Sequence, residues 1–166
     1  RSYWLKRFSV AAACIIAIIG LSTLFSHRKV DSEFGDPQII TLQANAGVRT
    51  RFNLPDGTVV YLNSGSVLSY PMSYDQKERK VYLSGEAYFK VSHNPEQPFV
   101  VSVADDNMHI RVLGTEFNVQ AYQDEENIQT TLVKGSVKLL YKSESGTMVE
   151  QSLKPSEKAD FNHLSK

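Results

Sequence analysis

An uncharged apolar segment near the start of the chain most constrains what this protein can fold into. Residues 8–25 read FSVAAACIIAIIGLSTLF and carry no charge. At a rise of about 1.5 Å per residue, a helix of this length spans roughly 27 Å, close to the thickness of the hydrocarbon core of a bilayer. A helix buried in a soluble core usually carries one polar stripe, and this segment has none. The sequence therefore predicts a membrane-spanning helix over residues 8–25.

The flanks of this segment fit a membrane-spanning helix but leave its orientation open. Tyr3 and Trp4 stand where interfacial aromatic residues occur, and basic residues lie on both sides. A cleavable signal peptide is the competing interpretation, but the apolar stretch is long for one and no A-x-A cleavage site follows it. Three bases precede the segment and two follow it closely, a difference too small for the positive-inside rule to decide the orientation.

The distribution of charge separates the N-terminal segment from the rest of the chain. Residues 1–29 contain five bases and no acid, whereas residues 30–166 hold the other 13 bases and all 18 acids, so their formal charges are +5 and −5. An acidic domain of this kind is not expected to bind nucleic acid. Residues 30–38 are polar and include a Gly and a Pro, which favours a tether, and the chain from Ile39 onward is long enough to bury a core.

Apolar residues alternate with polar or aromatic ones through much of the remaining chain, as is typical of β-strands. In the clearest example, Val81 and Leu83 precede a glycine, and Ala87, Phe89 and Val91 follow it. Similar blocks occupy residues 58–62, 110–113, 117–122, 128–133 and 137–141. No segment after the first helix has a convincing 3.6-residue apolar stripe. The sequence thus predicts a mainly β fold: a single transmembrane helix followed by an all-β domain that is solenoid-like or sandwich-like.

Four glycines stand at the junctions between these blocks, namely Gly57, Gly85, Gly114 and Gly135. A glycine at such a junction can supply a positive φ or a tight bend where the chain turns a corner. Residues 54–57 read LPDG, a turn in which Pro sets φ, Asp bonds back to the backbone and Gly takes the left-handed conformation. Residues 63–66 (NSGS) predict a second turn.

Patterns for catalysis or metal binding are sparse. The four histidines are far apart in sequence and the single cysteine lies in the predicted helix, so we expect no metal and no cofactor and assign no catalytic residue. Glu86 and Glu116, each just past a junction glycine, are the one carboxylate pair that a glycosidase could use. The simpler expectation is that each lies on a solvated face or pairs with a base such as Arg79, Lys80 or Arg111.

Several short motifs follow one another in a fixed order between about residues 45 and 160. They are LPDGT at 54–58, LNS at 62–64, YP at 70–71, GEAYFKV at 85–91, PFVV at 98–101, VLGTEFNV at 112–119, TLVKGSV at 131–137 and LKP at 153–155. Each is weak alone, but their order and spacing resemble the FecR family of transmembrane anti-sigma factors, most closely the versions found in Bacteroides-like bacteria.

This resemblance implies a membrane topology and a division of the chain, which would then be a middle fragment of a longer regulator. The expected parts are a truncated cytoplasmic flank at 1–7, a single inner-membrane span at 8–25, a periplasmic tether at 26–38, a FecR-like β domain in the periplasm at 39–160, and the start of a linker to a second sensor subdomain at 161–166. The resemblance, and not the charge pattern, is what orients the helix.

The resemblance also implies a function without enzymatic activity. In the family, the signalling domain of a TonB-dependent outer-membrane transporter contacts the periplasmic part, here expected mainly through the absent C-terminal subdomain. Proteolysis then releases an extracytoplasmic-function (ECF) sigma factor, which would bind the absent N-terminal domain. The residues that contact these partners are not identified by the sequence. Two alternatives stay open: a membrane-anchored glycan hydrolase that uses Glu86 and Glu116, and a passive β-rich domain of the cell envelope.

Overall fold

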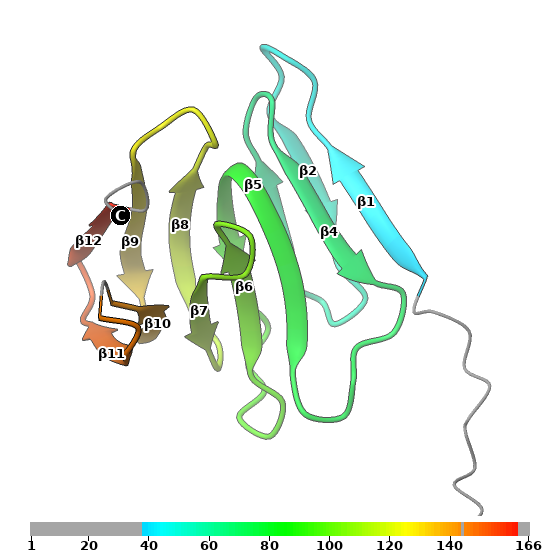
Figure 1. The fold of residues 1–166 in the computed structure, drawn as a ribbon. Coiled ribbons are helices and arrows are strands. Elements are labelled where there is room, and N and C mark those ends of the chain that lie inside the picture. The colour runs from blue at the N-terminus through cyan, green and yellow to red at the C-terminus, as the bar shows by residue number, and fades with distance from the viewer. Residues whose placement is uncertain (1–37, 144, 163–166) are drawn as a thin grey trace, which may run out of the picture. The chain divides into compact units, whose positions relative to one another are not determined.

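Twelve β-strands make up the part of the chain that the computed structural model describes, residues 38–143 and 145–162 (Figure 1). They are β1 (Ile39–Gln43), β2 (Thr50–Asn53), β3 (Val59–Leu62), β4 (Val67–Pro71), β5 (Arg79–Lys90), β6 (Phe99–Val103), β7 (Met108–Val112), β8 (Glu116–Ala121), β9 (Asn127–Lys134), β10 (Val137–Lys142), β11 (Met148–Leu153) and β12 (Lys158–Asn162). Among these residues no helix is long and apolar enough to cross a membrane. The helix predicted at 8–25 lies outside the described residues and stays a prediction.

The long strand β5 belongs to two sheets. Its first half, residues 79–84, lies in sheet A, which has the order β1-β4-β5-β6-β7-β10-β11. Its second half, residues 85–90, lies in sheet B, which has the order β2-β3-β5-β8-β9-β12. Neighbouring strands are antiparallel except β5 and β6, which are parallel. All twelve strands therefore form one hydrogen-bonded network that is continuous through β5.

The two sheets pack face to face over an apolar core. Phe89 of sheet B lies 6.0 Å from Phe99 of sheet A, measured between ring centroids, and stacks at 5.2 Å on Phe117 of the neighbouring strand. Odd-numbered residues of β5 are buried on both sides of Gly85, so one face of this strand supplies core side chains to both sheets. The mainly β fold is confirmed, and the two facing sheets correspond to the sandwich-like form of the prediction.

Gly85 lets β5 pass from one sheet to the other. Its φ is +99°, a conformation that side chains with a Cβ rarely adopt. A Cβ at this position would lie 2.7 Å from Ser66 Cβ and 2.8 Å from Ser66 Cα, and it would also collide with Ser66 Oγ. With glycine at this position, Ser66 Oγ accepts a hydrogen bond of 2.8 Å from Glu86 N. Backbone conformation and close packing both require a glycine here.

Both predicted turns are present. In the LPDG turn, which joins β2 to β3, Gly57 N donates to Leu54 O at 3.0 Å and Thr58 N donates to Asp56 Oδ1 at 3.0 Å. Gly57 has a φ of +83°, as the turn type requires. Residues 63–66 form the second turn, which links β3 in sheet B to β4 in sheet A.

The chain crosses between the sheets at opposite edges in its two halves. In the first half of the chain, the segments that cross from one sheet to the other are 44–49, 63–66 and the bend in β5. We name the side of the sandwich where they lie the Gly85 edge. In the second half the crossings are 91–98, 113–115, 135–136 and 154–157, on the opposite side, the Gly114 edge. There the hairpins 104–107, 122–126 and 143–147 each stay within one sheet and lie at the Gly85 edge. The second half of the sandwich is therefore open at the Gly85 edge.

Alternation predicts six of the twelve strands and misses the other six for identifiable reasons. It predicts β3, β5, β7, β8, β9 and β10. β6 has no alternation because it is the central strand of sheet A and is buried on both faces. The edge strands β1, β2, β11 and β12 have few fully buried positions, so their apolar signal is weak. β4 runs directly into residues 72–78 (MSYDQKE), a polar and charged stretch without apolar alternation.

Replacing Gly85 by alanine is expected to destabilise the domain much more than the same change at Gly146. Both glycines have a positive φ, +99° and +78°, but a Cβ at Gly146 meets nothing within 4 Å. We expect a loss of about 3 kcal/mol or more for Gly85→Ala, from strain plus overpacking, against about 1 kcal/mol for Gly146→Ala. Urea unfolding of the full chain in mild detergent measures both, and equal losses would contradict the proposed role of Ser66.

Candidate functional site

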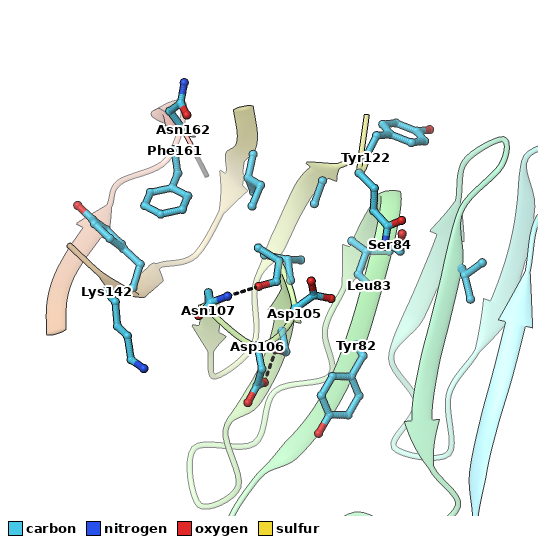
Figure 2. A pocket seen from close by; sticks show the side chains of 18 of the residues that line it. Tyr82, Leu83, Ser84, Asp105, Asp106, Asn107, Tyr122, Lys142, Phe161 and Asn162 are labelled. Carbon is cyan, nitrogen blue, oxygen red and sulfur yellow. Dashed lines mark hydrogen bonds between the residues drawn. The ribbon is translucent and has the colours of Figure 1, made fainter. Parts of the chain in front are cut away.

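A cavity of about 1020 Å³ opens where the sandwich is open, at the Gly85 edge of its second half (Figure 2). Sheet A contributes residues 102–107 and 141–143 to its lining, together with Val67, Ser69 and residues 82–84 of β4 and β5, and sheet B contributes 121–123, 128 and 160–162. Figure 2 shows Asp105, Asp106 and Asn107 on the turn of sheet A, with Phe161 and Asn162 across from them on the other sheet. The cavity follows from the path of the chain. At this edge the strands of the second half are joined by hairpins that stay within one sheet, rather than by segments that cross to the other sheet.

Aromatic side chains line the cavity from both sheets. Tyr141 of β10 and Phe161 of β12 have ring centroids 4.8 Å apart and join sheet A to sheet B at this end. Val103 and Ile128 are buried beneath the opening. The Tyr122 hydroxyl is already used, since it donates a hydrogen bond of 3.1 Å to the backbone oxygen of Ser64. The lining can therefore accept an apolar group against the rings, with polar groups at the rim.

One turn on the rim has an unusual backbone. Ala104, Asp105 and Asp106 have φ values of 51°, 50° and 69°, which costs non-glycine residues about 1–2 kcal/mol each. Asn107 compensates in part, because its backbone N and its side-chain Nδ2 both donate to Ala104 O, at 3.0 Å and 2.9 Å. The turn is thus held in place by its own hydrogen bonds.

Asp106 ties this turn to the outer face of sheet A. Its Oδ1 accepts a hydrogen bond of 2.5 Å from Ser102 Oγ and lies 2.7 Å from Lys80 Nζ. Burial by itself would raise the pKa of Asp106, but the hydrogen bonds from Lys80 and Ser102 outweigh it, so the pKa is lowered. Burial would lower the pKa of Lys80, and the bond to Asp106 raises it instead. Both shifts favour the ion pair.

His109 lies beside this pair, with its Nδ1 3.7 Å from Asp106 Oδ1. Nδ1 is buried and has no hydrogen-bond partner among the described residues. Burial lowers the pKa of His109 below its ordinary value of 6.5, and the positive charges of Lys80 and Arg111 act in the same direction, while Asp106 and Glu78 oppose them. The neutral imidazole is therefore the form that the folded domain favours.

Glu86 and Glu116 lie on the outer face of sheet B, on the adjacent strands β5 and β8. Glu86 is paired with Gln120 in the ladder, four residues along β8 from Glu116, so the two Cα atoms are about 14 Å apart. Both side chains project from the same flat face, and neither lines the cavity of Figure 2. A hydrolase would need them to face one another across a bound glycan, and this arrangement does not favour that.

The two carboxylates have other partners than the predicted bases. Glu86 accepts hydrogen bonds from Asn63 Nδ2 at 2.5 Å and from Asn118 Nδ2 at 3.0 Å. Glu116 accepts one from the Tyr88 hydroxyl at 2.9 Å. The expectation of a partly solvated face is confirmed. Arg79, Lys80 and Arg111 are wrong as the specific partners, because they lie at the start of β5 or in β7 and pair with Asp56, Asp106 and Glu78. Glu116 does lie near a base, since Lys90 Nζ is 3.9 Å from Glu116 Oε2.

Arg79 is the largest fully buried side chain, although its residue type suggests the surface. Its Nη1 lies 2.6 Å from Asp56 Oδ2, with only 2% of the arginine side chain and 11% of the aspartate side chain exposed. Nη1 also donates to Ser92 O at 3.0 Å, and Nε donates to Gln97 O at 2.8 Å. The guanidinium carbon is 5.5 Å from the centroid of the Phe99 ring. One side chain therefore joins the LPDG turn to both ends of the 91–98 crossing.

Neighbouring polar groups complete this buried cluster at the Gly114 edge. Thr58 Oγ1 donates to Asp56 Oδ2 at 2.7 Å and accepts a hydrogen bond of 3.2 Å from Ser92 N. Burial raises the pKa of the Tyr74 hydroxyl, and the negative charge of Asp56 raises it further. The Asp56 carboxylate thus faces groups from three different segments of the chain.

Comparison with known proteins agrees with the order of the sequence motifs. The family model described as FecR protein matches residues 40–138, from β1 to the start of β10. This match covers more than half of the chain. The chain belongs to the FecR family. No match was found among curated proteins.

Two solved structures are also similar to this FecR-family chain. Both are crystal structures described as a "putative anti-sigma factor" from Parabacteroides distasonis ATCC 8503, at 2.50 Å and 1.65 Å resolution. Each is 32% identical to this chain, with TM-scores of 0.70 and 0.69, over 77% and 76% of this chain. The aligned region spans only 57% and 56% of those chains, so they are considerably longer than the part matched here.

The residues that carry the family resemblance act in this structure mainly as framework. In the LPDGT motif, Asp56 accepts a hydrogen bond from the buried Arg79 and another from the Thr58 hydroxyl, and Gly85 bends the shared strand. The burial of Arg79 was detectable in the sequence, because it has the same parity as Val81 and Leu83 in the alternating run. The cavity was not detectable, since its lining comes from segments that are far apart in the chain.

Replacing Arg79 by methionine is expected to cost about 3–5 kcal/mol of unfolding free energy, because it leaves Asp56 buried without its cation. Arg111→Met is the matched control: its pair with Glu78 spans 3.0 Å but its side chain is 44% exposed, so we expect a loss below about 1 kcal/mol. Adding Asp56→Asn to Arg79→Met should recover part of the loss. Urea unfolding of the full chain in detergent tests this, and similar losses for both arginines would contradict it.

The domain is expected to lose stability as the pH falls below about 6.5, through His109. Its pKa is lower in the folded state, so the unfolded chain takes up the proton first, and the stability present above 6.5 declines on the acid side. His109→Gln removes this titration. The thermal unfolding midpoint of the variant should therefore change less than that of the wild type between about pH 5 and 6.5, and the midpoints of the two proteins should be close at pH 8. An unchanged pH profile in the variant would contradict the assignment.

Proposed function

We propose that this chain is the membrane anchor and periplasmic sensor portion of an anti-sigma factor. In this proposal the helix at 8–25 spans the inner membrane once, and the β-sandwich lies in the periplasm. The signal comes from a TonB-dependent outer-membrane transporter and ends at a cytoplasmic ECF sigma factor. The observation that carries the proposal is the FecR-family match over residues 40–138, supported by the likeness to the two putative anti-sigma factor structures.

The physical task of the domain is then coupling rather than chemistry. A β-sandwich held by a short tether to a membrane helix can pass on a partner-induced change as exposure of a cleavable segment. Residues 30–38 are our candidate for that segment. We propose no enzymatic activity, since the carboxylates Glu86 and Glu116 are both engaged by amides or a tyrosine on an open sheet face. A passive envelope domain is the remaining alternative.

The topology can be tested with a single cysteine on a Cys14→Ser background. Asp124→Cys places a thiol in the exposed hairpin between β8 and β9. We expect a membrane-impermeant maleimide to label it in cells with a permeabilised outer membrane and an intact inner membrane. Ser2→Cys, at the opposite end of the predicted helix, is the matched control and should be labelled only after lysis. The reverse pattern would overturn the proposed location.

The regulatory role is tested by deleting the full-length gene and measuring transcription from a promoter of the associated sigma factor. A regulator changes that transcription, whereas a passive envelope domain leaves it unchanged. Under inducing conditions, immunoblots of a protein tagged at both ends should also show cleavage in or beside residues 30–38. The absence of any cut near this tether would contradict the proposed coupling.

A further inference from the structure

Four strands form the edges of the two sheets, and they differ in how they are protected against pairing with another chain. β2 carries Arg51, β11 carries Glu150, and β12 carries Lys158 and Asp160. Charged residues on an edge strand oppose the addition of a further strand. β1 reads IITLQ and has no charge, no proline and no irregularity in its pairing with β4. Among the described residues β1 is therefore the one unprotected edge.

The backbone of β1 offers a regular row of hydrogen-bonding groups on its open side. Met72 N donates to Gln38 O at 2.8 Å, and Ala44 N donates to Ser66 O at 3.0 Å. These bonds fix the even-numbered residues of β1 as the ones that bond to β4, because hydrogen-bonded pairs alternate in an antiparallel ladder. The N–H and C=O groups of Ile39, Thr41 and Gln43 consequently point away from β4.

Apolar side chains border this row. Ile40 and Leu42 of β1 and Phe52 of β2 are only partly buried, although they pack against the core, because they belong to the terminal strands of the sandwich. Ile39 and Met72 are 53% and 59% exposed at the start of the β1–β4 pair, where Ile39 is paired with Pro71, the residue before Met72. An added strand with apolar residues at alternate positions would cover Ile40, Leu42 and Phe52 and extend the core by one layer.

The charges near this edge favour an acidic partner segment. Arg49 and Arg51 are exposed, and neither forms an ion pair with another described residue. Arg49 stands just beyond the end of β1 that Gln43 occupies, in the link to β2. A carboxylate on the partner at that end would meet a cation that forms no ion pair with another residue that the structure describes.

We propose that β1 is a docking edge for an extended strand of a partner protein, with apolar residues at alternate positions and an acidic residue at the Gln43 end. Pairing with a second copy of this chain is disfavoured by size: a five-residue edge buries far less than the roughly 1,200 Å² of a stable interface, but it suits a transient signalling contact. The physiological role of this edge rests on the proposed function. β1 directly follows the predicted tether at 26–38, so a strand added to β1 would act where the tether joins the β domain.

Direct binding is tested by NMR titration of the labelled full chain in nanodiscs. The probe is a short capped peptide of alternating threonine and valine, with an aspartate at each end. We expect amide shifts at Ile39, Thr41 and Gln43. Binding should be lost when the peptide is N-methylated at the residues whose amides face β1, and kept when the alternate residues are methylated. Shifts at β2, β11 or β12 instead, no shifts up to the solubility limit, or a dimer by sedimentation would each overturn the proposal.

A pair of variants at Thr41 separates the backbone effect from the side chain. The Thr41 hydroxyl lies 3.1 Å from Ser69 Oγ, and both Thr41→Pro and Thr41→Val remove that contact. Only proline removes the outward N–H, at a site where an edge strand tolerates it. We expect about tenfold weaker peptide binding for Thr41→Pro, with Thr41→Val close to wild type. Equal affinities for these two variants would overturn the backbone docking.

The same variants in the full-length regulator link the edge to signalling. Thr41→Pro should abolish induction of the sigma-dependent reporter, whereas Thr41→Val should be induced as in wild type, with both proteins equally abundant. If gene deletion alters the reporter but Thr41→Pro is still induced normally, the docking edge is wrong and the regulatory function stands. If deletion has no effect, the proposed function fails while the peptide titration still decides the docking edge.

Discussion

The buried ion pair between Arg79 and Asp56 is the constraint on which the rest of this domain depends. Arg79 opens β5, the strand that both sheets share, and Asp56 belongs to the turn that begins sheet B's second strand. The same guanidinium holds the backbone at Ser92 and Gln97, which bracket the crossing from β5 to β6. A charge this deeply buried is stable only when it is paired and hydrogen-bonded, so Asp56, Ser92 and Gln97 must adopt one arrangement around it. Arg79 Nη2 is buried without a hydrogen-bond partner among the described residues.

The path of the chain explains why one end of the sandwich is closed and another is open. At the Gly114 edge, the Arg79 cluster ties the LPDG turn of the first half to the 91–98 crossing, which is the first crossing of the second half. At the opposite edge of the second half nothing of this kind joins the hairpins, and the cavity of Figure 2 results. Within the part of the chain that the structure describes, Tyr141 and Phe161 supply the ring contact between the sheets there.

In this FecR-family domain, the centre and the two ends of the sandwich differ in structure. The core and the Arg79 cluster connect the two sheets, whereas the two ends of the sandwich differ in their edge strands. At one end, the edge strands β11 and β12 carry charged residues. At the other end, β1 has no charged residue, and both β1 and β2 carry partly exposed apolar side chains. The edge strand that follows the predicted tether in sequence, β1, is thus the one without a charged residue.

Local patterns in the sequence determine six of the strands, two turns and the family of this protein. Period-two alternation identified the strands with one buried face, and the LPDG and NSGS turns, whose conformations depend on Pro, Asp and Gly themselves, were correct. The order of the motifs identified the family. Such features are encoded locally, so a single sequence contains them.

Tertiary structure alone decided what depends on contacts between distant segments. It decided that β6 is buried on both faces, that Glu86 and Glu116 are bound by asparagines and a tyrosine, and that β5 belongs to two sheets at once. It also decided where the cavity opens and that the uncharged strand β1 lies at the edge of a sheet. Each of these depends on which strands become neighbours, and that choice is made by the packing of the whole core rather than by any one stretch of residues.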